Sequence, residues 1–391
     1  MRRDFHKFLQ DQIEGLKKNG TYKYFKYNTG ALGGKINVEG FGDEIVLCSN
    51  NYLGLANNQE IIKAAHESLD RYGAGASSVR FICGTYDIHR ELEEKTAAFL
   101  GMEAALTYSS CWAANTACIP ALLSDGDFVI SDELNHASII DGSRMVSKGV
   151  KKAVYKHSDM ADLEEKLKEA ADSPSVLVVT DGVFSMEGDI AKLPEIASLC
   201  KKYKALLMAD DSHATGVIGK TGRGTMEHYG MKEGVDIISG TYGKALGGAG
   251  GGFIASTGDV CAMLAQKSRP HIFSNSLPPV LCAIALAAID YLEKNPGIVH
   301  SLTEKTKYMR RKIKEMGLNS LEGESAIIPI IIGDTAKAIA VSERMMKDGV
   351  FTIGFGFPVV AEGKARIRLQ VSDSLSYEDL DRALAVIQKA F

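Results

Sequence analysis

Between about residues 50 and 275, short runs of apolar residues alternate with amphipathic stretches, and this alternation is what most constrains the fold. Each run is apolar throughout and shorter than a typical helix. Strands of this kind are buried on both faces, as in a parallel sheet that helices cover on each side. The sequence therefore predicts an α/β architecture with a mostly parallel sheet. The predicted strands are 104–108, 128–130, 176–179, 205–209, 235–238 and 253–255.

The two ends of the chain differ from this central region. Residues 1–49 begin with a predicted helix, whose apolar residues recur at helical spacing, and continue into an arm that either covers the core or contacts a partner subunit. The arm contains Tyr22, Tyr24, Phe25 and Tyr27. From residue 286 onward, helices and two strands predict a small α+β domain, whose last helix opens with a capping box at Ser376. The predicted divisions are thus 1–49, 50–285 and 286–391.

Charge and cysteine usage exclude several classes of function. The chain has 45 Lys and Arg against 49 Asp and Glu, a net charge of −4, which argues against nucleic acid as the main partner. Its longest apolar run, residues 280–289, is far shorter than the about 20 residues that span a bilayer, so no membrane association is predicted. None of the 7 cysteines forms a Cys-x-x-Cys pair. Neither a disulfide framework nor a structural zinc site is expected, and a cytoplasmic location fits best.

Polar side chains follow five of the predicted strands. Ligands bind at the carboxyl ends of the strands in open parallel sheets, so we expect these side chains to lie together. Polarity of the loops alone does not explain five such strand ends. The residues are Ser109, Ser110, Cys111 and Trp112; Ser131, Asp132, Asn135 and His136; Thr180, Asp181 and Ser185; Asp210, Asp211 and His213; and Ser239, Thr241 and Lys244.

Lys244 is the candidate nucleophile. It lies among glycines and small residues, which allow the backbone to approach a planar ligand closely. A lysine desolvated there would favour its neutral amine, the form that makes a Schiff base. Taken alone, Lys244 could also be an exposed loop lysine, so its neighbours decide the interpretation.

Asp210 is such a neighbour, because a carboxylate at the end of a buried strand needs a positive partner. A protonated pyridine nitrogen is one such partner, and His213 could then bond a phenolic oxygen while His136 stacks on the ring. Hydroxyl groups and amides nearby could hold a phosphate. Together these residues predict a pyridoxal-phosphate site. The alternative is a metal bound by Asp210, Asp211 and His213, but no second histidine–carboxylate cluster in the sequence supports a metal.

The sequence resembles the α-oxoamine synthases, a pyridoxal-phosphate family with the fold type I aminotransferase architecture. The motifs that carry the resemblance are residues 181–186, 210–216 and 241–245, which are in register over essentially the whole chain. Within the family, residues 78–85, 135–142 and 268–277 are most similar to the branch that acts on glycine and acetyl-CoA. This resemblance implies a large domain built on a mostly parallel sheet and a smaller C-terminal domain.

The resemblance also implies an activity and its catalytic residues. The expected enzyme is an acyltransferase that uses pyridoxal 5'-phosphate to condense glycine with acetyl-CoA, giving 2-amino-3-oxobutanoate and CoA. Lys244 would form the Schiff base and move the glycine proton, and His136 would stabilise the developing oxyanion. The expected assembly is a homodimer with shared active sites.

Further contacts follow from the same resemblance. Asn50, His136 and Arg368 would bind the substrate, with Arg368 at its carboxylate; Arg366 shares a strand face with Arg368, so spacing alone does not separate the two. The cofactor would contact Lys244, Cys111, Trp112, His136, Ser185, Asp210, His213 and Thr241, together with Ser274 and Asn275 from the partner subunit.

Two positions depart from the pattern of this branch. Trp112 stands where a smaller aromatic residue is expected, and Tyr86 where a polar residue is expected, which leaves the acyl-chain length open. One alternative is an 8-amino-7-oxononanoate synthase that uses alanine and a pimeloyl thioester. The other is a non-catalytic regulator that binds pyridoxal phosphate, although the chain shows no helix-turn-helix-like extension.

Overall fold

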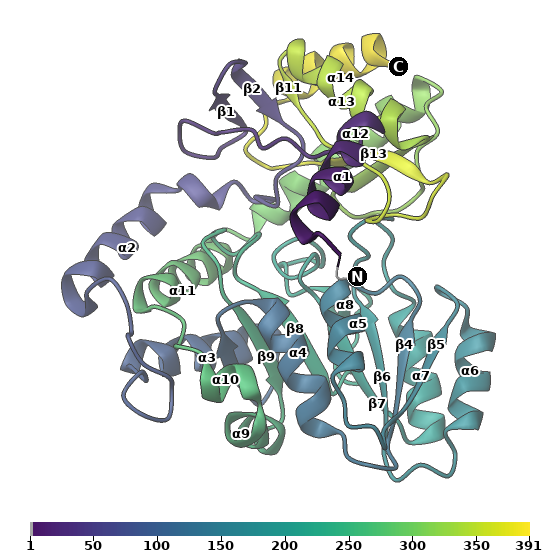
Figure 1. Cartoon of the computed structure of the whole chain (residues 1–391). Helices are drawn as coiled ribbons and strands as arrows, with labels where there is room; N and C mark the ends of the chain where they lie inside the picture. Colours follow the sequence, from purple (N-terminus) through teal and green to yellow (C-terminus); the bar gives the residue numbers. More distant parts are fainter. Residues whose placement is uncertain (1–2) are drawn as a thin grey trace.

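The computed structural model describes residues 3–391 and consists of a large α/β part and a smaller α+β part (Figure 1). The large part contains a seven-stranded sheet of order β3-β9-β8-β7-β6-β4-β5. Only β9 runs antiparallel to its neighbours, and every other pair of adjacent strands is parallel. The predicted sheet is therefore confirmed. Its strands are β3 (Ala104–Tyr108), β4 (Phe128–Asp132), β5 (Lys151–Tyr155), β6 (Val176–Asp181), β7 (Leu206–Asp210), β8 (Ile237–Thr241) and β9 (Gly252–Ser256).

Alternate residues of these strands pack into two different cores, one on each face of the sheet. In β6, Leu177 and Val179 pack with α4 (Cys111–Leu122), α5 (Ala137–Arg144) and α9 (Gly258–Lys267). Val178 points to the other face, where the covering helices are α3 (Asp87–Leu100), α6 (Met160–Glu169), α7 (Leu193–Tyr203) and α11 (Pro279–Lys294). Burial on both faces explains why the strand sequences are apolar throughout.

Strand β5 was not predicted from the sequence. It pairs only with β4 at the edge of the sheet, and its lysines Lys151 and Lys152 are exposed. Charged side chains are common on edge strands, because they discourage pairing with another chain. The apolar pattern that predicts central strands is absent from such a strand.

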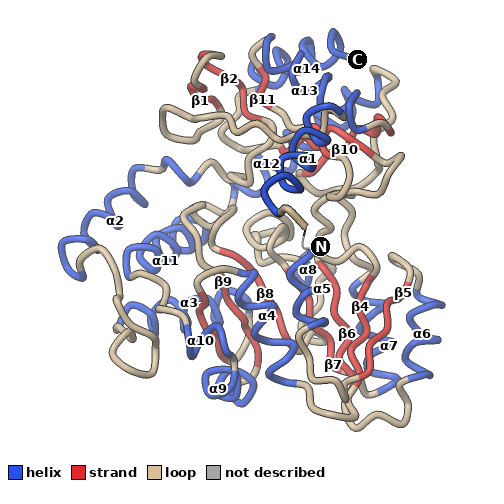
Figure 2. The backbone as a smooth tube through the Cα atoms, in the orientation of Figure 1, coloured by secondary structure: helices blue, strands red, loops and turns tan. Residues whose placement is uncertain are grey.

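The smaller part contains two three-stranded sheets, visible at the top of Figure 2. One has the order β10-β13-β12, and the other has the order β1-β2-β11, so that residues near the N-terminus pair with the C-terminal region. The proposed division at residues 49 and 285 remains a prediction. Ser376 and Asp379 form the predicted capping box. The elements are β1 (Lys35–Val38), β2 (Gly42–Val46), α12 (Gly297–Glu315), β10 (Ile327–Gly333), α13 (Thr335–Lys347), β11 (Val350–Phe351), β12 (Gly354–Phe355), β13 (Ala365–Gln370) and α14 (Tyr377–Ala390).

The N-terminal helix α1 (Phe5–Lys18) forms as predicted but buries none of its residues. Its apolar stripe is open to solvent, and so is most of the aromatic arm that follows. The exposed side chains are Phe5, Leu9, Ile13, Leu16, Tyr24, Phe25 and Tyr27. The remaining elements are a short 3-10 turn (Leu55–Asn57), α2 (Gln59–Tyr72), α8 (Thr225–His228) and α10 (Arg269–Phe273). Within residues 3–391, no helix combines the length and the apolar character that crossing a membrane requires.

Candidate active site

A cavity of about 220 Å³ lies at the carboxyl edge of the large sheet. All five strand ends contribute to it, as expected from the parallel arrangement. Seven residues of the predicted site line this cavity together: Cys111, Trp112, His136, Asp210, His213, Thr241 and Lys244. Ser110, Ser138, Asp181, Val183 and Ser212 complete the lining.

Asp210, the last residue of β7, is 4% exposed. Its carboxylate accepts hydrogen bonds from Asn115 Nδ2 (2.6 Å) and Ser212 N (2.9 Å), and the Cys111 thiol lies 3.6 Å away. Within residues 3–391, Asp210 forms no ion pair with a basic side chain. A buried carboxylate without a cationic partner fits a ligand that brings a positive charge, such as a protonated pyridine ring.

Lys244 lies on the turn after β8, in the wall of the same cavity. Burial lowers the pKa of its ammonium group below the usual range, and the attraction of Asp210 opposes this effect without cancelling it. The glycine segment behind Lys244 packs directly against the start of α4. A Cβ atom on Gly252 would lie 2.3 Å from Cys111 N, so a side chain there would push α4 away. Close packing of β9 on α4 thus requires glycine here, whereas the close approach of a planar ligand stays a prediction.

The first turn of α4 begins at Cys111 in the cavity wall. The first N–H groups of a helix have no partner within the helix, and such a terminus favours phosphate. Thr241 lies nearby, and its hydroxyl accepts from Gly243 N (3.0 Å) and donates to Gly251 O (2.9 Å). The free N–H groups at the start of α4 therefore fit the phosphate of pyridoxal phosphate. The Thr241 hydroxyl already donates its proton to Gly251 O, so its expected contact with the phosphate stays a prediction.

His213 is held as a neutral imidazole by a chain of hydrogen bonds that the sequence did not reveal. Gln370 Nε2 donates to Tyr52 Oη (2.7 Å), so the phenol proton is free to be donated to His213 Nδ1, also at 2.7 Å. Nδ1 then accepts, and the ring carries its own proton on Nε2. Burial lowers the pKa of His213 well below its usual range, which agrees with a neutral ring. His213 can therefore donate to an oxygen of a ligand in the cavity.

His136 is oriented in a similar way. Its Nδ1 atom accepts from Ser138 N (3.2 Å) and lies 2.7 Å from Ser138 Oγ, which leaves Nε2–H as the donor. Burial lowers the pKa of His136. Its backbone N–H donates to Asp181 Oδ2 (3.0 Å), which fixes the start of α5 next to β6. The Trp112 ring meets His136 edge to face, with centroids 5.9 Å apart.

Arg368 and Arg366 have different hydrogen-bond and ion-pair partners, and this difference distinguishes their roles. Arg366 forms an ion pair with Glu187 at 2.9 Å. Arg368 donates to Ser185 O (3.0 Å) and to Gln370 Oε1 (2.8 Å), and its buried Nε atom has no partner among the described residues. Within residues 3–391, no carboxylate pairs with Arg368, although it is 8% exposed. Its guanidinium is the one of the pair that can take a substrate carboxylate.

The remaining predicted residues lie outside the cavity lining. Asn50 accepts from Gln370 Nε2 (2.8 Å) and so touches the network that leads to His213 and Arg368. Ser185 contributes its carbonyl to Arg368. Ser274 and Asn275 are exposed on the surface of the single chain. Their expected contact with a cofactor would have to be made in a neighbouring subunit.

Asp211 does not point toward a metal site. Its two oxygens accept from Thr225 Oγ1 (2.6 Å) and Thr225 N (2.9 Å), and burial raises its pKa to about 7. Among the residues that the structure describes, no group of three or more His, Cys, Asp or Glu side chains could hold a metal ion.

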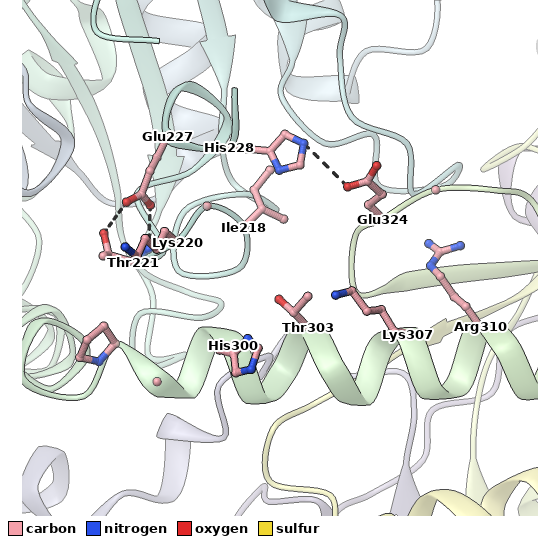
Figure 3. A pocket seen from close by; sticks show the side chains of 14 residues that line it. Ile218, Lys220, Thr221, Glu227, His228, His300, Thr303, Lys307, Arg310 and Glu324 are labelled. Atoms are coloured by element: carbon pink, nitrogen blue, oxygen red, sulfur yellow. Dashed lines mark hydrogen bonds and ion pairs between the residues drawn. The ribbon is translucent and has the colours of Figure 1, made fainter. Parts of the chain in front are cut away.

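A larger cavity of about 740 Å³ lies between residues 218–228 and helix α12 (Figure 3). Its polar side chains bond mainly to the protein itself: Glu227 caps its own loop, and Arg310 donates to three backbone carbonyls. His228 lies 4.0 Å from Glu324, as the dashed line in Figure 3 shows. This lining does not combine a buried lysine with an unpaired carboxylate, so the smaller cavity is the better candidate for catalysis.

Comparison with known proteins agrees with this geometry. The model of a family described as aminotransferase class I and II matches residues 42–387. The mitochondrial 2-amino-3-ketobutyrate coenzyme A ligase of Bos taurus is 47% identical over 377 residues, 96% of this chain and 90% of that protein. The 8-amino-7-oxononanoate synthase of Thermoanaerobacter pseudethanolicus is 43% identical over 383 residues, 98% of this chain and 96% of the relative.

The fold is likewise shared with a solved enzyme. The structure of a serine palmitoyltransferase from S. paucimobilis with a bound PLP–myriocin aldimine superimposes with a TM-score of 0.93 at 28% identity, covering 100% of this chain and 98% of that chain. This likeness confirms the predicted fold type I architecture. The chain belongs to the aminotransferase class I and II family, in its α-oxoamine synthase branch.

Proposed function

We propose that the protein is a pyridoxal 5'-phosphate-dependent acyltransferase that condenses glycine with acetyl-CoA to give 2-amino-3-oxobutanoate and CoA. The observation that carries the proposal is the pair of unneutralised buried charges, Asp210 in the cavity wall and Arg368 in the network that reaches it. The Asp210 carboxylate requires a cationic partner, and the Arg368 guanidinium requires an anionic partner. The 2-amino-3-ketobutyrate coenzyme A ligase of Bos taurus, at 47% identity, supports the choice of substrates.

Asp210, His213 and Lys244 are the residues that act on the cofactor in this proposal. When bound, pyridoxal phosphate supplies an aldehyde that condenses with amines and a protonated ring that withdraws electrons from the amino acid. Asp210 would hold the ring proton of the bound cofactor, and His213 would donate to its phenolic oxygen. Lys244 holds the cofactor and then, released as a neutral amine, accepts the proton from the glycine α-carbon. The lowered pKa of Lys244 raises the fraction of this neutral form.

Substrate binding and acyl transfer use the remaining groups. Arg368 binds the glycine carboxylate and fixes the direction of its Cα–H bond. His136 donates its Nε2–H to the oxygen that becomes negative when the thioester carbonyl is attacked. The new carbon–carbon bond replaces the carbon–sulfur bond, and the CoA sulfur leaves as the thiol after protonation.

The proposed enzyme is a homodimer, and a second copy of the chain covers α1 and the aromatic arm. Their apolar side chains have no core of their own to cover, since α1 buries none of its residues. Ser274 and Asn275 are exposed and suit a contribution to the partner's site. We also propose a cytoplasmic location, because all seven cysteines are free.

The test is thiol release by the purified protein with glycine and acetyl-CoA, run beside alanine and pimeloyl-CoA. We expect release with the first pair. Preference for the second pair would make the protein an 8-amino-7-oxononanoate synthase, a candidate that the 43% identical relative favours. No release with either pair, in a protein that binds the cofactor, would instead favour the regulator.

A further inference from the structure

Asn115 lies behind the cavity wall and touches groups from two opposite sides of the site. It is 0% exposed, in the middle of α4, and it does not line the cavity. Its Nδ2 group donates to Asp210 Oδ2 at 2.6 Å and to Ser138 Oγ at 2.9 Å. Both protons of one amide are therefore used on two different elements, the end of β7 and the first turn of α5.

The two bonds act on two groups of the cavity wall, Asp210 directly and His136 through Ser138. Asp210 accepts at 2.6 Å, a short distance typical of a charge-assisted hydrogen bond. Ser138, with its oxygen accepting from Asn115, directs its hydroxyl proton to His136 Nδ1 (2.7 Å). That proton keeps Nδ1 an acceptor, so His136 presents Nε2–H.

The orientation of the Asn115 amide follows from these partners. An ionised carboxylate can only accept, so the nitrogen must face Asp210. The amide oxygen is buried and has no hydrogen-bond partner among the described residues. A fold that tolerates an unsatisfied buried oxygen loses free energy, which indicates that the two donor bonds are what the position requires. Helices α4 and α5 pack closely at this point, because a Cβ on Gly142 of α5 would lie 2.9 Å from the backbone carbonyl oxygen of Asn115.

We infer that Asn115 is a positioning residue that couples Asp210 to His136. It fixes the carboxylate of Asp210, which would hold the ring proton of the cofactor, and, through Ser138, the tautomer of His136. The inference rests on the proposed function, since it assigns Asn115 a task toward the same cofactor. Within the described part of the chain, no other side chain bonds to both Asp210 and Ser138.

The test compares four variants in their affinity for pyridoxal 5'-phosphate, followed by its visible absorption, and in turnover. Asn115→Leu removes both donors at similar volume and should weaken cofactor affinity about tenfold or more, as expected for a lost bond to a charged group. Ser138→Ala keeps the bond to Asp210, so cofactor affinity should hold while kcat falls. Thr116→Val is the matched control in α4, because its hydroxyl bonds only backbone carbonyls of the same helix.

Asn115→Asp separates positioning from a structural role. Two carboxyl groups in contact resist ionising together, so one keeps a proton to higher pH than usual and can donate to Asp210 as the amide does. Cofactor affinity of this variant should approach that of the wild type at low pH and fall as the shared proton is lost, whereas that of Asn115→Leu should not follow this course. The titratable groups that face Asp210 stay unchanged in both variants: Cys111, His136, Asp181, Asp211 and Lys244.

The outcomes distinguish the inference from the proposed function. If the wild-type protein does not bind pyridoxal phosphate, the proposed function fails. If the wild type binds it and folded Asn115→Leu binds it equally well at every pH, the inference is overturned. Equal loss of affinity in Thr116→Val, or parallel pH curves for both Asn115 variants, would show a purely structural role and would also overturn it.

Discussion

Arg366 and Arg368 lie on the same buried face of β13, and only Arg366 has an acidic partner among the described residues. The Glu187 carboxylate neutralises Arg366, whereas Arg368 is left with a carbonyl, an amide oxygen and the face of the Phe355 ring at 4.7 Å. A buried guanidinium without a carboxylate is costly unless a ligand completes it. Two arginines that are equivalent by spacing therefore have different tasks.

Arg368→Gln should raise the KM for glycine about tenfold or more, because a charge-assisted bond to the substrate carboxylate contributes about 1.5–3 kcal/mol. The visible absorption of the bound cofactor should stay unchanged, since Arg368 is not part of the cavity lining. Steady-state kinetics at saturating acetyl-CoA measures the effect.

Arg366→Gln is the matched control for this variant. It leaves Glu187 partly buried without its ion pair and should lower the melting temperature rather than raise the KM for glycine. The opposite assignment would show the large KM change in Arg366→Gln, and the carboxylate would then bind there.

Lys244→Ala should abolish the covalent attachment of the cofactor and reduce turnover at least about a hundredfold, because no other side-chain amine of residues 3–391 lines the cavity. Reduction of the wild-type holoenzyme with borohydride, followed by peptide mass spectrometry, should place the cofactor on Lys244. Lys220→Ala is the control, since Lys220 lines the larger cavity next to α12. Attachment at Lys220, or retained turnover in Lys244→Ala, would contradict the assignment.

His157 bonds to two carboxylates, and this gives a prediction for the pH dependence of stability. Its ring lies 3.0 Å from Asp132 and 3.1 Å from Asp189. Burial alone lowers the pKa of His157, but the hydrogen bonds and the charges of both carboxylates outweigh it and raise the pKa to about 10. The unfolded value is about 6.5. The histidine thus stabilises the fold fully below about pH 6.5 and loses this contribution as the pH rises toward 10.

The measurement is urea unfolding of the wild type and of His157→Gln at pH 6, 8 and 10, as chosen conditions. The wild type should be more stable by on the order of 2 kcal/mol at the lowest pH, and the difference should shrink toward the highest. A difference that stays constant with pH would mean that folding does not raise the pKa of His157.

Much of the site could be predicted from the sequence because it depends on strand ends. A parallel sheet gathers the residues after its strands, so the order of the apolar runs is enough to predict that Asp210, His213 and Lys244 lie together. The partners of these residues could not be predicted in that way. Asn115 lies inside a helix, so it follows no strand. His157 follows the edge strand β5, which was not predicted because its sequence is charged rather than apolar. Their roles depend on which side chains face each other across the sheet.

Elements that depend on a local sequence pattern were predicted, and contacts between distant residues were missed. The predicted strand at 104–108 agrees with β3 at both ends. The links through Tyr52 and Gln370 join residues 318 positions apart in the chain, a pairing that periodicity cannot reveal. Only the packing of the smaller part against the large sheet places them beside His213.

The exposed face of α1 leads to a prediction about assembly. A double substitution, Leu9→Lys with Ile13→Lys, puts charge on two apolar side chains that are 40% and 42% exposed in the single chain. Burying such a side chain on association contributes about 1.5–3 kcal/mol, so the dimer should dissociate at concentrations where the wild type stays associated. Asp11→Lys is the control, since it changes charge on the polar face of the same helix.

Sedimentation equilibrium measures the association, and turnover at the same concentration should fall with the dimer because Ser274 and Asn275 are then missing from the partner's site. A double variant that remains a dimer would place the interface elsewhere, and a fully active monomer would contradict shared sites.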